Sequence, residues 1–88
     1  MANLETADMI AKTRRVSAEA LLEGRADLSQ YPFQLLTVTT LRGMGVERVA
    51  YAASAAEFLM QYGWELVSLG NFTESNVVCA VMRRRLPA

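Results

Sequence analysis

The sequence predicts an α+β domain of the order β-α-β-β, with a three-stranded, mainly antiparallel sheet, one helix packed on one face and an N-terminal helical segment. Eighty-eight residues suffice for one small domain. Residues 46–62 carry apolar side chains at helical spacing and no proline. Runs rich in Val, Leu and Thr stand on both sides of this stretch, as expected for strands.

The first predicted strand covers residues 33–41, FQLLTVTTL, and follows Pro32. Glycines at residues 43–45, GMG, then interrupt the chain before the helix. Such a turn could bind an anion with Arg42 or Arg48 beside it. Because the third glycine and the Lys-Ser/Thr pair of phosphate loops are missing, we interpret it as a tight turn.

The predicted helix of residues 46–62 ends at a glycine. Two apolar stripes follow helical spacing, one of Val46, Val49, Ala53, Ala56 and Met60, the other of Tyr51, Ala55, Phe58 and Tyr62. Gly63 stands one place beyond the last periodic residue, where chains often turn with positive φ. It therefore ends the helix and reverses the chain.

Trp64 begins the second predicted strand and is expected to fill the corner between helix and strand. Strict alternation places Trp64, Leu66 and Ser68 on one side and Glu65, Val67 and Leu69 on the other. The structural signature of this junction is Gly63, Trp64, Leu66 and Val67.

The third predicted strand, residues 77–82, is apolar on both faces, so we place it in the centre, antiparallel to its neighbours. A short turn at residues 73–76 favours a hairpin with the second strand. The right-handed crossover rule allows the first two strands to run parallel.

The N-terminal segment is predicted to be a helical extension and loop over residues 1–30, followed by the β-α-β-β domain over 31–88. Residues 4–14 and 17–23 contain helix formers, and Ser17 is a candidate N-cap. Basic residues at 12–15 interrupt the apolar periodicity between them.

One helix covers only one face of a sheet, and the broken periodicity of the N-terminal segment makes it a poor cover for the other. Large bare apolar patches are rare on monomers. We therefore expect a homo-oligomer, most simply a two-fold dimer, or a place in a larger protein complex. The candidate interface residues are Leu36, Val38, Val77, Val78, Cys79 and Val81.

The composition disfavours catalysis. The chain has no histidine and a single cysteine, Cys79, so the commonest general base and any intrachain disulfide are excluded. We predict no enzyme activity, no cofactor and no metal. The N-terminus has no signal-like apolar stretch, and no run is long enough to span a membrane, so we expect a cytoplasmic protein without membrane contact.

Nine basic and nine acidic residues cancel, which gives no general attraction to nucleic acid. The strongest charged signal is Arg83, Arg84 and Arg85, the candidate anion or nucleic-acid contact. Alternation separates Arg84 from the other two, so they form no single patch. Pairing with Glu47, Glu57 or Glu65, or protection of a strand end against aggregation, would also explain them.

The stretches GWELVSL, residues 63–69, and VMRRRLP, residues 81–87, carry a resemblance to a known family. They resemble the domain-of-unknown-function 4177 family of small bacterial proteins, which typically have a helix ending in glycine, a Gly-Trp-Glu-Leu-Val-Ser strand and a last strand with a basic end. The likeness covers residues 31–87. This chain differs from the family in two ways. About thirty residues precede its first strand, and its basic end has three arginines where the family usually has a Lys-Arg pair. The resemblance implies the fold and no activity.

The sequence therefore predicts a non-catalytic protein-interaction and self-association module. The alternative is a small nucleic-acid-binding regulator that uses Arg83, Arg84 and Arg85 together with Arg14 and Arg15.

Overall fold

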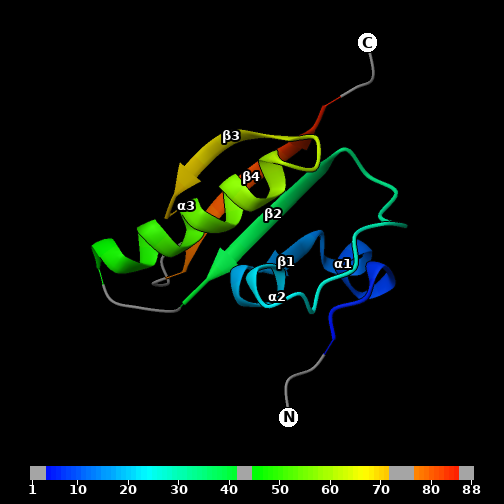
Figure 1. Ribbon diagram of the computed structural model, residues 1–88, viewed down its shortest axis with the longest axis horizontal. Helices are drawn as coiled ribbons and strands as arrows, with labels where there is room; N and C mark the ends of the chain where they lie inside the picture. The colour runs from blue at the N-terminus through cyan, green and yellow to red at the C-terminus, as the bar shows by residue number, and fades with distance from the viewer. Residues whose placement is uncertain (1–3, 42–44, 72–76, 86–88) are drawn as a thin grey trace.

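The fold is built on a mixed sheet of four strands in the order β1-β2-β4-β3 (Figure 1). The computed structural model describes residues 4–41, 45–71 and 77–85. Its strands are β1 (Arg15–Ser17), β2 (Leu35–Thr40), β3 (Trp64–Gly70) and β4 (Val78–Arg84), and its helices are α1 (Ala7–Thr13), α2 (Ala18–Leu22) and α3 (Val46–Met60).

The α+β class is confirmed, and the sheet is larger than predicted. Strand β4 lies between β2 and β3 and runs antiparallel to both, as its continuous apolar sequence indicated. The prediction of three strands is corrected by β1, which pairs in parallel with β2 at the opposite edge. A three-residue strand with one buried side chain, Val16, has too short an alternation to be recognised from sequence.

A left-handed residue separates α1 from β1. Arg14 has φ 59° and ψ 29°, and its N–H donates to the carbonyl of Ile10 at 2.6 Å. The Arg14 carbonyl then accepts from Thr37 N–H at 3.0 Å, which starts the pairing with β2. The basic stretch that interrupts the apolar pattern is therefore a helix end and a strand start.

Ser17 caps α2, as predicted. Its Oγ accepts a hydrogen bond from Ala20 N–H at 3.1 Å. The Ser17 hydroxyl and N–H in turn donate to the carboxylate of Glu5, at 2.6 and 3.1 Å. This network ties the segment before α1 to the β1–α2 junction.

The N-terminal segment shares one hydrophobic core with the rest of the chain. Ile10, Val16 and Leu21 belong to the same buried cluster as Leu36 and Leu59. Helix α2 contacts both α3 and β2, so it lies on the side of the sheet that α3 covers (Figure 1). The division at residue 30 thus separates two parts of the sequence that pack together. In the described ranges, no helix is both long and apolar enough to cross a membrane.

Helix α3 forms where predicted, but it buries a different stripe. The buried residues are Ala52, Ala55, Ala56 and Leu59. Val46, Val49 and Met60, assigned to the first predicted stripe, are exposed by 84%, 41% and 49% of their surface. Most residues of α3 are apolar, so spacing alone did not reveal which face packs.

Strand β3 contains a bulge that breaks the predicted alternation. Leu66 pairs with Met82, whereas the next pair joins Ser68 to Val81, so Val67 is an extra residue. Beyond the bulge, Leu69 is opposite Ala80 and packs against the core. Strict alternation had placed Leu69 on the side away from Trp64. The bulge shifts the alternation by one residue, so that prediction is wrong.

Candidate interaction surface

Gly63 and Trp64 form the predicted corner between α3 and β3. Gly63 has φ 91°, a conformation that costs other L-residues about 1–2 kcal/mol. Its carbonyl accepts from Arg85 N–H at 2.6 Å, which ties the corner to the end of β4. Trp64 is 4% exposed. By contrast, Leu66 and Val67, the other two signature residues, are 42% and 53% exposed.

Arg84 packs over this corner on the helix side of the sheet. Its guanidinium carbon lies 4.9 Å from the ring centroid of Trp64 and 5.9 Å from that of Tyr31. One Arg84 Nη2 hydrogen goes to the Tyr31 carbonyl at 2.9 Å, and the Tyr31 hydroxyl donates to the Leu35 carbonyl at 2.6 Å. Burial raises the pKa of Tyr31, and the charges of Arg14 and Arg84 partly oppose this rise.

Arg83 and Arg85 point to a different partner from Arg84. Arg83 Nη2 lies 3.3 Å from one Glu65 carboxylate oxygen, and Arg85 Nε lies 3.8 Å from the other. Both ion pairs are exposed, so each contributes little to stability. The predicted pairing with Glu65 is present, and the three arginines are divided between two environments, as alternation indicated.

The sheet face opposite α3 has no described helix over its central strands, because α1 contacts β1 alone among the strands. We call it the uncovered face. Strand register places on it Arg15, Ser17, Leu35, Thr37, Thr39, Glu65, Ser68, Cys79, Val81 and Arg83. Leu35 is 51% exposed, and Thr37, Thr39 and Val81 are half-buried. Burial raises the pKa of the Cys79 thiol, which the charge of Arg15 partly offsets.

The predicted interface residues are divided between the two faces. Leu36, Val38 and Val78 lie on the α3 side and are at most 6% exposed, so they are core residues rather than surface residues. Cys79 and Val81 lie on the uncovered face. Val77 precedes β4 and is half-buried. Because β4 is apolar on both sides, its sequence does not reveal which alternate set faces the helix.

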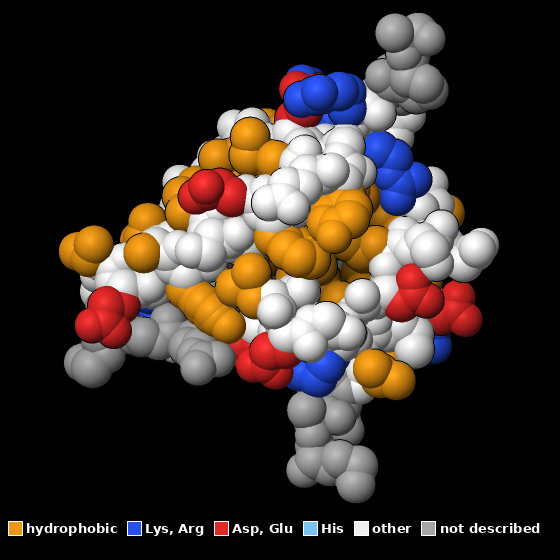
Figure 2. Space-filling view, viewed as in Figure 1, with side chains coloured by type: hydrophobic (Ala, Val, Ile, Leu, Met, Phe, Trp, Pro, Cys, Tyr) orange, Lys and Arg blue, Asp and Glu red, His pale blue; other side chains and the backbone are white. Residues whose placement is uncertain are grey.

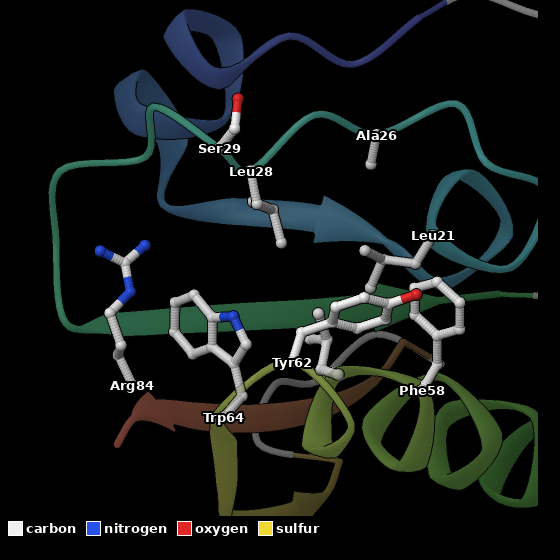
Figure 3. Close-up of a pocket in the computed structure, with 9 residues that line it drawn as sticks. Leu21, Ala26, Leu28, Ser29, Phe58, Tyr62, Trp64 and Arg84 are labelled. Atoms are coloured by element: carbon white, nitrogen blue, oxygen red, sulfur yellow. The ribbon is translucent and has the colours of Figure 1, made fainter. Parts of the chain in front are cut away.

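A groove on the α3 side was not predicted from the sequence (Figure 3). It measures about 480 Å³ and lies between the α2 region and the C-terminal end of α3. Its lining comes from many separate parts of the chain: Leu21, Ala26, Leu28, Ser29, Phe58, Leu59, Tyr62, Trp64 and Arg84. Figure 2 shows hydrophobic side chains gathered around a hollow at the centre of this face.

The loop above the groove is fixed by its own hydrogen bonds. The Ser29 hydroxyl and N–H both donate to Asp27 Oδ1, at 2.7 and 2.9 Å, and these bonds lower the pKa of Asp27. In Figure 3 the Ser29 hydroxyl points away from the groove. Among the described lining residues, the other polar side-chain groups are therefore the Arg84 guanidinium, the Tyr62 hydroxyl and the Trp64 indole N–H.

The predicted anion site lies only in part within the described residues. Residues 42–44, which include its Arg42, lie outside them. Gly45 is the N-cap of α3, with φ 57°. Within the part of the chain that the structure describes, no three His, Cys, Asp or Glu side chains gather as a metal site would require.

Comparison of the chain with protein-family models, with curated proteins and with solved structures gives no match. The resemblance to the domain-of-unknown-function 4177 family therefore stays a prediction.

Proposed function

We propose that this chain is a non-catalytic interaction module that associates with a second copy of itself through the uncovered face. The observation that carries the proposal is the arrangement of the layers. Both α2 and α3 lie on the Leu36 and Ala80 side of the sheet, while Val81 and its neighbours on the other side have no described helix over them. Sheets bury such faces by packing on another layer about 10 Å away.

The centre of the uncovered face suits packing against another sheet. Thr37, Thr39, Cys79 and Val81 occupy neighbouring positions on β2 and β4, and none carries a charge at neutral pH. Charged groups stand around them, with Arg15 on one edge strand and Glu65 on the other. An uncharged centre with a polar rim is the usual anatomy of a protein interface.

The rim favours a second copy as the partner. A two-fold axis parallel to the strands would place the β1 edge of one copy over the β3 edge of the other. Arg15 of each copy would then lie near the edge that carries Glu65 of the other, and the pairing occurs twice by symmetry. The formal net charge of zero adds no long-range repulsion between copies.

The alternative, a nucleic-acid-binding regulator, has less support. Arg83 and Arg85 are paired with Glu65, and Arg84 lies over Trp64 and donates to a backbone carbonyl. A phosphate backbone would have to compete with these contacts, and the three cations do not point to one side. We therefore expect no salt-dependent binding to duplex DNA or RNA.

Charge substitutions on the two sides of β4 test the proposal. Val81→Glu places a carboxylate at the centre of the uncovered face, where association would desolvate it without a partner. We expect a folded chain that sediments as a monomer under conditions where the wild type is dimeric. Val78→Glu puts the same charge on the helix side, at a residue 6% exposed, and should unfold the chain.

Val49→Glu is the matched control, because Val49 is an exposed apolar residue of α3, away from the uncovered face. It should fold and sediment as the wild type does. If Val81→Glu associates as strongly as the Val49→Glu control, the interface lies elsewhere.

A further inference from the structure

The groove beside Trp64 combines an apolar wall with one cation, and we propose that it binds a small apolar monoanion, specifically a carboxylate with a short alkyl or aryl body. The site is on the opposite side of the sheet from the proposed self-association face. The two proposals therefore stand on different residues and can fail separately.

The shape and lining of the groove suit a small molecule. Its volume of about 480 Å³ is within the range of about 300–1,000 Å³ that is typical of ligand sites. Half-buried Phe58 and the edges of Leu21 and Trp64, each 4% exposed, form an apolar wall. Ala26 and Leu28 approach from the loop above (Figure 3). Such a wall gains free energy by covering an apolar body, roughly in proportion to the area removed from water.

Arg84 supplies the charge that selects an anion. It stands at one end of the groove, beside Trp64 and away from Phe58 and Leu21 (Figure 3). Among the described residues that line the groove, none is an Asp or Glu. The Arg84 contacts in the described structure are to two aromatic rings and one backbone carbonyl, and none is an ion pair with a carboxylate.

The geometry of Arg84 favours a carboxylate over other groups. A guanidinium has five N–H donors, and the structure assigns one Nη2 hydrogen to the Tyr31 carbonyl. The remaining donors match the two oxygens of a carboxylate. Packing on Trp64 and the bond to Tyr31 hold the side chain in place, so little rotamer freedom is lost on binding.

Trp64 makes the test direct, because it is the one tryptophan of the chain and lines the groove. Its fluorescence is titrated with octanoate, octanol and octylamine, each kept below the concentration at which it aggregates. We expect a saturable spectral change with octanoate, weaker binding of octanol and the weakest binding of octylamine. Equal affinity for all three would overturn the assignment of Arg84, and no saturable change with octanoate would overturn the site.

Three variants locate the binding. Arg84→Gln should lower octanoate affinity about tenfold or more while leaving that for octanol nearly unchanged. Arg83→Gln, which removes a charge on the other face, should leave both affinities unchanged. Because Arg84→Gln also loses packing, Ala26→Leu provides a second test: it fills the groove without altering a charge and should weaken both ligands.

Circular dichroism first establishes that each variant is folded. Octanoate affinity that is unaffected by Ala26→Leu, or that falls equally with Arg83→Gln and Arg84→Gln, would contradict the site. The monomeric Val81→Glu chain should bind octanoate as the wild type does, which separates this proposal from self-association.

Discussion

Replacing Trp64 with alanine should destabilise the chain more than any other single truncation at the α3–β3 junction. The indole is 4% exposed and contacts three parts of the structure. Its ring lies 6.1 Å from the Tyr31 ring, packs in the core cluster with Leu59 and Met82, and supports the Arg84 guanidinium. Truncation would leave a cavity and remove the surface on which Arg84 rests.

The expected cost is about 3–5 kcal/mol, the usual range for truncating a buried tryptophan or phenylalanine. At about 0.05–0.15 kcal/mol per residue, a chain of 88 residues has a free energy of unfolding of about 4–13 kcal/mol. The loss is therefore a large share of the total. At about 4–8 °C per kcal/mol for a domain of this size, the midpoint of thermal unfolding should fall by about 12–40 °C.

Thermal unfolding followed by circular dichroism measures this change. All chains are compared at one protein concentration, because association makes the midpoint depend on concentration. Val67→Ala is the matched control, since Val67 is in the same strand and 53% exposed, and it should change stability by at most about 0.5 kcal/mol. A Trp64→Ala chain that melts as close to the wild type as this control does would refute the corner packing.

Three other predictions concern the helix face, the glycine and alkaline pH. Leu59→Ala should cost about 2–5 kcal/mol in urea unfolding, whereas Val46→Ala should change stability by at most about 0.5 kcal/mol, because only Leu59 faces the core. Gly63→Ala should cost about 1–2 kcal/mol, from positive φ alone, since a Cβ there meets no atom within 4 Å. Burial raises the pKa values of Tyr31 and Cys79, so the folded chain holds these protons more tightly than the unfolded chain. Stability should therefore fall as the pH rises above about 8.5.

Each of these has a clear contrary result. Equal losses for Leu59→Ala and Val46→Ala would mean that α3 is rotated from the position described. Gly63→Asn should cost less than Gly63→Ala, because asparagine tolerates positive φ better, and the reverse order would contradict the backbone argument. The double variant Tyr31→Phe with Cys79→Ala should flatten the alkaline decline, and an unchanged decline would assign it to other groups.

The α3–β3 junction could be predicted because its signals are local. A glycine directly after a helical run indicates a turn with positive φ, whatever the rest of the fold is. The tryptophan that follows it needs a large buried site. The central place of β4 followed from an apolar sequence on both faces. These inferences depend on a few neighbouring residues, whose preferences the rest of the fold did not override.

Other features depend on contacts that are distant in sequence. The buried face of α3 is marked mainly by alanines, so the larger Val46 and Val49 gave a misleading stripe. Val67 looks like any strand residue, and only its pairing with β4 identifies it as the bulge. The groove brings Leu21 and Arg84 to opposite ends of one cavity, and no spacing along the chain predicts that.

Self-association of the wild-type chain is the central claim, and sedimentation equilibrium tests it most directly. Measured across the micromolar range, the wild type should give a mass that rises toward twice that of one chain. A mass of one chain throughout that range, with the chain fully folded, would contradict the account and leave the uncovered face open to solvent.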